Sequence, residues 1–401
     1  MLTRILNLQK RLPSAQSAFL FGPRGTGKTS LCNEYLKTVP HAWSVDLLSL
    51  SLYKKLLRRP SLFREEVESR LPPPGQVLTV LVDEIQKLPS LLDEVHSLIE
   101  THKGKVQFLL TGSSARKLIR GGANLLAGRA WTLKLHPLTC LEMSLNLEKA
   151  LRWGTLPAVY LSDGVPDQTL LAYTDTYLKE EILQESIVRK AEPFMQFLDL
   201  AAQSNGDPVN HSSLARTIHV SPNTIQVYYD ILVDTLVALR LPGWSQSVRK
   251  QLMHAPKYYF FDCGVLNALR GELELELRPH TYRTGKLFET FLINEANRLN
   301  DYTDSRYRFH YWRTNTGQEV DLILQKSATR PPIAIEIKAA DSVTESDLHG
   351  LKAFGQEHSA ARLVCLCQTS ARTTLGKVEI FPWEEGLANI FNRGIPANIL
   401  A

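Results

Sequence analysis

Short apolar runs alternate with stretches of helical spacing in the first third of the chain. Three runs, SAFLFG, TVLVDE and VQFLLTGSS, reach Gly, Asp or Ser at their ends and are followed by helical patterns, and HAWSVDLL adds a fourth run. Strands buried on both faces read as continuous apolar runs, and their alternation with helices is typical of a parallel sheet. The pattern predicts a doubly wound α/β domain over residues 1–135.

The middle of the chain is dominated by helical spacing. Residues 136–190 place apolar positions three and four apart, as in QTLLAYTDTYLKEEILQE, and we interpret them as a helical lid segment. Residues 191–250 predict a winged-helix domain. A short helix and a turn at HVSP precede a second helix that starts at Ser221 and Pro222, and ALRLPGW suits a wing strand.

The remaining residues, 251–401, predict a further α/β domain. The strand KYYFF comes first, then the long helix TGKLFETFLINEANRL, then strand, hairpin, strand, helix and strand. The aromatic residues of KYYFF fit a buried core better than a base-stacking platform. A chain of 401 residues exceeds the usual size of a single core, which favours several domains.

Composition narrows the class of protein only slightly. Hydrophobic residues make up 44% of the chain, and the net charge of +5 permits a polyanionic partner without requiring one. Five scattered cysteines indicate reduced, buried thiols and no zinc site. No apolar run reaches the roughly eighteen residues of a membrane span, so we expect a cytoplasmic protein.

A glycine-rich loop follows the first strand. GPRGTGKT matches the pattern G-x-x-x-x-G-K-[ST] directly between a strand and a helix. In that setting the loop amides surround phosphates, the lysine reaches the β and γ phosphates, and the threonine hydroxyl of Thr29 faces Mg²⁺. We predict an ATP and Mg²⁺ site whose nucleotide-binding residues are Gly22, Pro23, Arg24, Gly25, Thr26, Gly27, Lys28, Thr29 and Ser30.

Two adjacent acids end the run TVLVDE. We predict that Asp83 holds the magnesium ion and that Glu84 polarises the attacking water. The next strand ends in TGSS, where Thr111, Ser113 or Ser114 would lie beside the phosphates as a polar sensor, and Ser113 is our candidate. The loop, the acids and the polar strand together predict an ATPase site.

Adjacent acids followed by a polar strand make residues 1–135 resemble the AAA+ ATPases. The resemblance implies ATP hydrolysis in an oligomer, which we expect to be a hexameric ring, with an arginine supplied by the neighbouring subunit. Arg116, Arg120 and Arg129 lie downstream of the sensor strand. Arg129 is our candidate because Gly128 and the apolar residues before it suggest a fixed loop. A surface arginine without catalytic weight is the alternative.

Charged residues interrupt apolar strands near the other end of the chain. Asp321 ends the run GQEVD, and Glu336 and Lys338 point to one side of the next strand, IAIEIKA. Glu289 would contribute from the preceding helix. Converging carboxylates beside a lysine suit hydrolysis of a phosphodiester by divalent ions. We predict a metal pocket of Glu289, Asp321 and Glu336, with Lys338 as a catalytic cation.

A helix with Glu, a strand with Asp and a Glu-x-Lys strand resemble the PD-(D/E)XK nuclease superfamily over residues 257–385. The Pro-Asp dipeptide is absent, because Val320 precedes Asp321. The resemblance implies a restriction-endonuclease-like fold and metal-dependent cleavage of nucleic acid. A nuclease fold kept for binding or scaffolding, with its acids in ion pairs, is the alternative.

The whole arrangement is similar to prokaryotic AAA+ ATPases that carry a C-terminal domain of unknown function with a nuclease-like core. GTLPAVY, YFFDCGVLNALRG and YWRTNTGQEVDLIL add to this likeness. Two functional classes stay open. One is an ATP-driven oligomeric motor or remodeller that acts on DNA. The other is an ATP-dependent regulatory switch that acts on a protein partner, with the C-terminal domain as inactive scaffold.

The predicted helix-turn-helix at 212–234 is the best candidate for DNA contact. Asn223, Thr224 and Gln226 start its second helix, where base or phosphate contacts usually arise. The stretch that follows would add phosphate contacts from three basic residues, Arg249, Lys250 and Lys257. A winged helix that contacts only protein is the alternative.

Overall fold

The structure of the chain is a computed structural model, which describes residues 3–113, 116, 118, 126, 128–178, 191–245, 247 and 254–391. The chain forms two compact units. Unit 1 comprises Met1–Pro137 and Asp234–Leu236, and unit 2 comprises Leu138–Val233 and Val237–Ala401. The segment 136–190, interpreted above as a lid, therefore lies almost entirely in unit 2.

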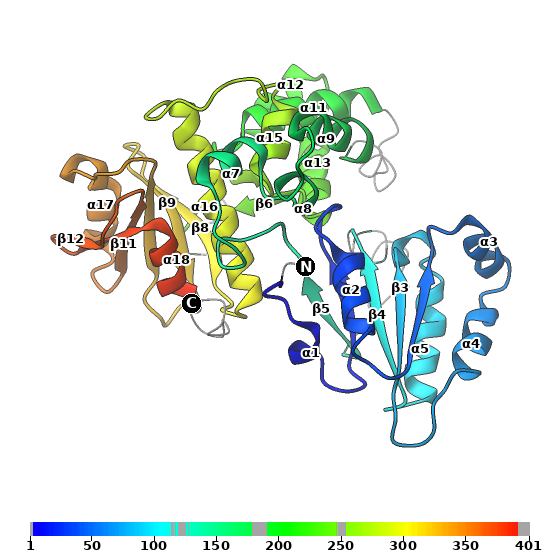
Figure 1. The fold of residues 1–401 in the computed structure, drawn as a ribbon. Coiled ribbons are helices and arrows are strands. Elements are labelled where there is room, and N and C mark those ends of the chain that lie inside the picture. The colour runs from blue at the N-terminus through cyan, green and yellow to red at the C-terminus, as the bar shows by residue number, and fades with distance from the viewer. Residues whose placement is uncertain are drawn as a thin grey trace. The chain divides into compact units, whose positions relative to one another are not determined.

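A five-stranded parallel sheet forms the centre of unit 1 (Figure 1). The four apolar runs all form strands, which confirms that part of the prediction. The fifth strand was not predicted, because it lies at the sheet edge and its Trp131 is 46% exposed, so no continuous apolar run marks it. In spatial order the strands are β2 (Ala42–Asp46), β3 (Leu78–Asp83), β4 (Val106–Gly112), β1 (Ser17–Phe21) and β5 (Ala130–Lys134).

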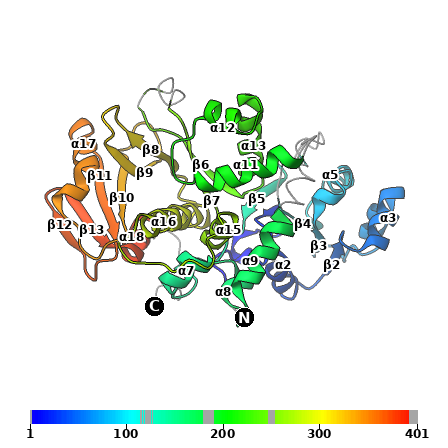
Figure 2. The same cartoon turned by 90° about the horizontal axis from the view of Figure 1, so that it is seen from above.

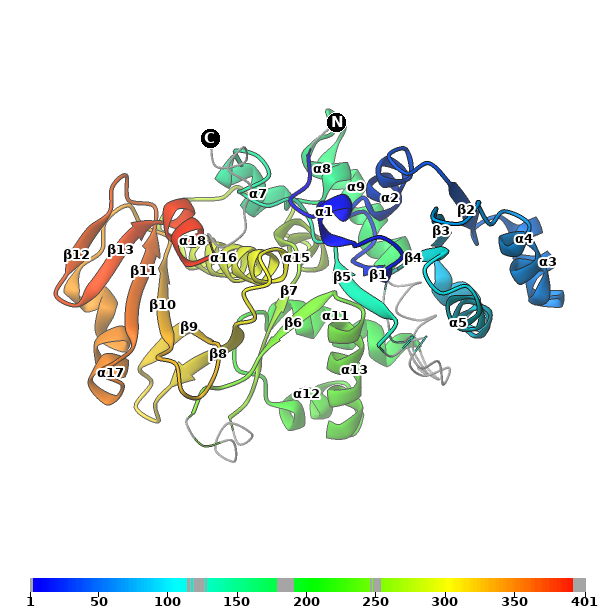
Figure 3. The ribbon, with the colours of Figure 1, turned by 90° about the horizontal axis from the view of Figure 1, so that it is seen from below.

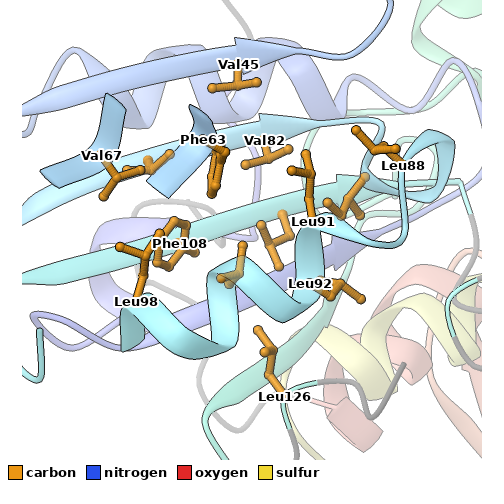
Figure 4. Packing of buried hydrophobic residues seen from close by; sticks show 14 of the residues in the cluster. Val45, Phe63, Val67, Val82, Leu88, Leu91, Leu92, Leu98, Phe108 and Leu126 are labelled. Carbon is orange, nitrogen blue, oxygen red and sulfur yellow. The ribbon is translucent and has the colours of Figure 1, made fainter. Parts of the chain in front are cut away.

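Helices cover both faces of this sheet. Val82 and Phe108 share one face and pack with Phe63 and other apolar residues of the helices there (Figure 4). On the opposite face the hydroxyl of Tyr35 donates to Gln107 Oε1 at 3.2 Å, which places α2 there. The helices of unit 1 are α1 (Leu8–Arg11), α2 (Lys28–Leu36), α3 (Leu50–Arg58), α4 (Ser61–Glu68) and α5 (Leu91–Thr101), with a 3-10 turn η1 (Ile85–Lys87) after β3.

Unit 2 begins with short helices that are tied to its own interior. The buried carboxylate of Asp262 accepts the backbone N–H of Thr155 at 2.7 Å and caps α15 through Gly264 N at 2.9 Å. Arg298 donates to the Leu138 carbonyl at 2.9 Å. These contacts explain why the segment belongs to unit 2. Its elements are α7 (Leu147–Trp153), α8 (Pro157–Tyr160), α9 (Pro166–Ala172), the π-helical η2 (Tyr173–Leu178) and α15 (Cys263–Leu269).

Three helices and a two-stranded sheet follow, and Figure 3 shows them grouped together. Strand β6 (Ala238–Leu241) pairs antiparallel with β7 (Lys257–Phe260), with Leu239 opposite Tyr259. The predicted boundary between 250 and 251 therefore falls between two strands that share a hydrogen-bond ladder. The helices are α11 (Ala191–Gln203), α12 (His211–Thr217) and α13 (Pro222–Asp234).

A six-stranded mixed sheet completes unit 2 (Figure 2), with α17 (His349–Glu357) on one face and α16 (Tyr282–Tyr302) and α18 (Trp383–Phe391) on the other. Phe354 of α17 packs on Ile323 and Ala334, whereas Phe291 of α16 meets Trp383 of α18. No helix of the described chain, α16 with its 21 residues included, is long and apolar enough to cross a membrane. In spatial order the strands are β12 (Thr373–Leu375), β13 (Val378–Pro382), β11 (Arg362–Cys367), β10 (Ile333–Lys338), β9 (Glu319–Gln325) and β8 (Arg308–Arg313).

Candidate functional site

The glycine-rich loop joins the carboxyl end of β1 to the first turn of α2. Gly25 and Gly27 have φ of 83° and 91°, which is left-handed backbone that glycine adopts without steric cost. A Cβ on Gly22 would stand 2.2 Å from the carbonyl oxygen of Leu135. Glycine is therefore required at Gly22 by packing and at the other two positions by backbone conformation.

Lys28 lies inside this loop rather than on its surface. Its ammonium donates to the carbonyls of Gly22 at 2.7 Å and Pro23 at 3.2 Å, and the residue is 7% exposed. Thr26 also donates to the Pro23 carbonyl, at 2.8 Å. The loop thus surrounds the ammonium group of Lys28, and this arrangement suits the binding of a phosphate anion. Of the other predicted loop residues, Arg24, Thr29 and Ser30 are exposed.

Arg4, near the start of the chain, stabilises the phosphate loop, and no sequence pattern identified it as a residue of this site. Its guanidinium donates to the Thr26 carbonyl at 2.8 Å and to the His136 carbonyl at 2.7 Å. These bonds join segments 22 and 132 residues away from Arg4. No local pattern reports contacts of that range.

Asp83 ends β3 next to the loop. Its Oδ2 accepts the hydroxyl of Thr29 at 2.9 Å, and its Oδ1 accepts the hydroxyl of Thr111 from β4. Both partners are neutral hydroxyls, which can turn toward a cation, and these two contacts bring no positive charge that would compete with one. The donor set of one carboxylate and one threonine hydroxyl fits Mg²⁺ between the loop and the strand.

Glu84 follows directly and has a left-handed backbone, with φ of 60°. Its N–H donates to Thr111 Oγ1 at 3.2 Å, and its Oε2 accepts the amide of Gln86 at 2.5 Å. The same amide nitrogen donates to Ser113 at 3.2 Å. The structure therefore brings the predicted acid and the predicted sensor together through Gln86, which the sequence did not single out. Ser114, the other sensor candidate, lies outside the described residues.

Arg129 stands just before β5, whose first residue Ala130 pairs with Ser17 at the start of β1. It is therefore at the amino edge of the parallel strands, whereas the phosphate loop is at their carboxyl edge. Its guanidinium forms an ion pair with Glu100. Contact with the nucleotide of its own subunit is excluded by this position, so any catalytic role would be toward a neighbour. Arg120, an alternative, lies outside the described residues.

The predicted carboxylates of unit 2 do lie on adjacent strands. The ladder pairs Leu322 with Ile335, so the next positions along β9 and β10 are Asp321 and Glu336. Asp321 Oδ2 accepts the backbone N–H of Ile337 at 2.8 Å, and Lys338 Nζ lies 2.7 Å from Glu336 Oε1. The hairpin geometry expected for these three charged residues is confirmed.

Lysines, rather than carboxylates alone, fill the rest of this cluster. Lys257 of β7 is 1% exposed and lies 2.5 Å from Glu319 and 3.7 Å from Glu289. Glu289 also accepts the hydroxyl of Tyr259 at 2.6 Å and lies 3.3 Å from Lys286. Lys257 was expected to contact phosphates from the surface, and that expectation is wrong, because its ammonium is buried between acids.

Burial and mutual repulsion shift the acids of this cluster. Burial, with the negative charge of Glu289, raises the pKa of Asp321 to about 6 against the opposing effect of Lys257 and Lys338. Burial and then Asp321 raise the pKa of Glu336 well above its ordinary value. Burial alone would lower the pKa of Lys257, but the neighbouring carboxylates outweigh it and raise that pKa. The charges of this cluster therefore act strongly on one another.

The predicted metal group is not formed by these contacts. Within the described ranges, no three His, Cys, Asp or Glu side chains are arranged to hold a metal ion. Glu289, Asp321 and Glu336 instead share their surroundings with three lysines. Among the described residues, Glu336 Oε2 is buried and has no hydrogen-bond partner.

The predicted DNA-contacting residues begin α13. Asn223 and Gln226 are exposed, and Ser221 caps the helix through the N–H of Thr224 at 3.1 Å. The first turn thus presents polar side chains to solvent. Arg249 and Lys250, the remaining candidates for phosphate contacts, lie outside the described residues.

Comparison with protein families divides the chain into three matches. A family described as AAA domain matches residues 14–144, and two described as domains of unknown function, DUF8612 and DUF4143, match residues 144–276 and 284–385. Residues 14–144 therefore form an AAA-type, ATPase-like domain.

Similar proteins are also found in bacteria. An uncharacterized protein of Mycobacterium tuberculosis is 27% identical over 343 residues, covering 82% of this chain and 72% of that protein. An uncharacterized protein of Haemophilus influenzae is 23% identical, covering 71% of this chain and 72% of that protein.

Two solved structures share more distant likeness. The structure of C. elegans PCH-2 is 17% identical in sequence, with a TM-score of 0.26. The match covers 58% of this chain and 64% of the PCH-2 chain, which is less than two thirds of its length. The replication initiator DnaA bound to AMPPCP and single-stranded DNA is 14% identical with a TM-score of 0.29, covering 57% of this chain and 86% of that chain. Both TM-scores lie below 0.5, so neither likeness establishes a fold.

Proposed function

We propose that unit 1 binds ATP with Mg²⁺ and hydrolyses it. The observation that carries this proposal is the 2.9 Å hydrogen bond from Thr29, in the phosphate loop, to Asp83, at the end of β3. The two residues are 54 positions apart, and their contact puts a hydroxyl and a carboxylate beside the loop that encloses Lys28. That combination serves phosphate and a divalent cation together.

Each residue of this edge has a distinct task in the proposed reaction. The loop amides and Lys28 hold the phosphates, and Thr29 and Asp83 orient oxygen atoms toward the cation. When bound, Mg²⁺ neutralises phosphate charge. Glu84 accepts a hydrogen bond from the attacking water and draws its proton, which directs the water at the terminal phosphorus.

Phosphate release by the full chain tests this proposal directly. We expect turnover that requires Mg²⁺, stops with a chelator and falls at least about 100-fold in Lys28→Ala, since one preorganised charged donor contributes on this order. Lys352→Ala, which removes an exposed lysine paired with Glu345, is the matched control and should retain turnover. Equal turnover by wild type and Lys28→Ala would refute the proposal.

We further propose that ATP turnover drives an oligomeric motor or remodeller that acts on DNA, with Arg129 completing the site of a neighbouring subunit in a hexamer. Support comes from the position of Arg129 away from its own loop and from the exposed polar start of α13. DNA that stimulates turnover in proportion to its length favours this motor. Unchanged turnover with DNA, together with no salt-sensitive DNA binding, favours the regulatory switch on a protein partner.

Phosphodiester cleavage by unit 2 is a second candidate, favoured by the buried Oε2 of Glu336, for which no described residue supplies a hydrogen bond. Lysine pairing of Glu289 and Glu336 opposes it, and among the described residues no three such side chains are arranged to hold a metal ion. Incubation with DNA and RNA under Mg²⁺ or Mn²⁺ decides the matter. Cleavage that is lost in Asp321→Ala or Lys338→Ala supports a nuclease. No cleavage of any form supports a scaffold.

A further inference from the structure

Gln86 is a buried polar residue to which the proposed ATPase reaction assigns no role. It lies on the turn η1 just after β3 and is 6% exposed. Its Nε2 donates to Glu84 Oε2 at 2.5 Å and to Ser113 Oγ at 3.2 Å. Ser113 follows β4 and is 5% exposed. One amide group therefore joins the proposed base to the end of the neighbouring strand.

The other end of the same amide is unsatisfied. Gln86 Oε1 is buried and has no hydrogen-bond partner among the described residues. A carboxylate only accepts, so the NH₂ side of the amide has to face Glu84 and the oxygen has to face away. That oxygen lies against Gly112, where an added Cβ would stand 2.7 Å from it. A glycine at 112 thus leaves the room that Gln86 occupies.

A purely structural residue here would be expected to be apolar. A buried amide oxygen without a partner costs free energy, whereas a leucine or methionine of similar size would fill the same space without that cost. The backbone of Glu84 adds to the cost, because a non-glycine residue at φ 60° is strained. Strained residues of this kind are found mainly at active sites and ligand-binding sites, where the strained conformation contributes to function.

We propose that Gln86 is a positioning residue that holds the Glu84 carboxylate for ATP hydrolysis and couples it to β4 through Ser113. This inference rests on the proposed ATPase function. The amide fixes one oxygen of Glu84 and with it the orientation in which the carboxylate would meet the attacking water. Gln86 acts through Glu84 and has no predicted contact with nucleotide, so its loss changes the rate of hydrolysis rather than the affinity for ATP.

Separate measurement of kcat and KM for ATP tests this role. We expect Gln86→Leu to lower kcat about 10- to 100-fold, the range typical of residues that orient a reacting group, while KM and the Kd for a non-hydrolysed ATP analogue change less than about threefold. Gln86→Glu is of equal size and keeps the site polar, but it replaces the donor with a second carboxylate, and we expect the same loss.

Gly112→Ala disturbs Gln86 without altering it. The added methyl group would meet Gln86 Oε1 at the distance given above, so the amide has to move and kcat should fall while ATP affinity holds. Gly104→Ala is not a suitable match, because Gly104 has a positive φ. Gly285, where a Cβ meets nothing within 4 Å, provides the control, and Gly285→Ala should keep wild-type kcat.

A double-mutant cycle shows whether Gln86 acts through Glu84. In a Glu84→Ala background, Gln86→Leu should lower the residual rate less than twofold. Full additivity, a wild-type kcat in Gln86→Leu and Gln86→Glu, or a parallel loss of ATP affinity would each overturn the inference. If Gln86→Leu proves unfolded in a thermal melt, Gln86→Glu and Gly112→Ala decide. A wild-type protein without turnover would instead refute the proposed ATPase function.

Discussion

Two sets of acids, one in each unit, are held in opposite ways. In unit 1, Asp83 is held by the hydroxyls of Thr29 and Thr111, and Glu84 by the amide of Gln86, and these three partners are all neutral. In unit 2, Glu319, Glu289 and Glu336 are paired with three lysines, Lys257, Lys286 and Lys338, whereas Asp321 accepts the backbone N–H of Ile337.

The difference bears on what each set of acids can do. Neutral donors fix a carboxylate and leave its charge to attract a cation, whereas a lysine at 2.7 Å already supplies that charge. The sites look alike in sequence, since each has acids at the ends or in the middle of apolar strands. Only the contacts distinguish an edge suited to Mg²⁺ from a cluster that neutralises itself.

Removal of a buried lysine is the largest expected effect in unit 2. Lys257→Met should lower the free energy of unfolding by about 3–5 kcal/mol, because it leaves Glu289 and Glu319 without their buried partner. Denaturant unfolding of the full chain measures it. Lys352→Met, at an exposed pair, should cost less than about 1 kcal/mol. Equal, small losses in both variants would show that the cluster is not neutralised by Lys257.

The hydroxyl contact in unit 1 gives the next largest effect. Thr29→Val keeps the shape but removes the oxygen that bonds Asp83, so apparent Mg²⁺ affinity in ATP turnover should fall about 10- to 100-fold. Thr29→Ser keeps the hydroxyl and should stay within about threefold of wild type. Titration of Mg²⁺ at saturating ATP measures both. A wild-type Mg²⁺ response in Thr29→Val would remove Thr29 from the cation site.

The pH dependence of stability gives a smaller and sign-specific effect. The pKa of Asp321 rises from 3.8 to about 6 on folding, so between pH 4 and 6 the folded state binds more protons than the unfolded state, and stability falls as pH rises. Asp321→Asn is neutral throughout and should melt about 2–6 °C above wild type at pH 7.5 and equally at pH 4.

The exposed Asp341 supplies the control for that experiment. Asp341→Asn should leave the melting temperature unchanged at both pH values, since surface substitutions have small effects. A destabilised Asp321→Asn at pH 7.5 would mean that ion pairing with the lysines outweighs burial of the carboxylate.

Local patterns predicted the phosphate loop and the strands around it, because the apolar strand, the glycine-rich turn and the helix follow one another directly in the sequence. They also predicted Asp321 beside Glu336, since a hairpin keeps its partners close. Contacts between distant segments were not predictable in this way. Lys257 read as one more basic residue of a polar stretch, yet its partner Glu319 is 62 residues away.

The same limit applies to Arg4 and to the edge strand β5. Arg4 has the appearance of a surface charge near the start of the chain, but it bonds the backbone of the phosphate loop. Strand β5 carries exposed residues and lacks an apolar run. Gln86 is the exception. It stands only two residues after Glu84, and a glutamine so close to a predicted catalytic acid can be found from the sequence alone.

Matched neutralisation of one acid in each unit tests the contrast most directly. ATP turnover and thermal melting would be measured for Glu84→Gln and Glu336→Gln in the full chain. We predict that Glu84→Gln loses at least about 100-fold in kcat and still binds ATP, because its carboxylate acts on the attacking water. Glu336→Gln should keep wild-type turnover, because its carboxylate belongs to the other unit and is paired there with Lys338. Wild-type turnover in Glu84→Gln, or lost turnover in Glu336→Gln, would contradict the account.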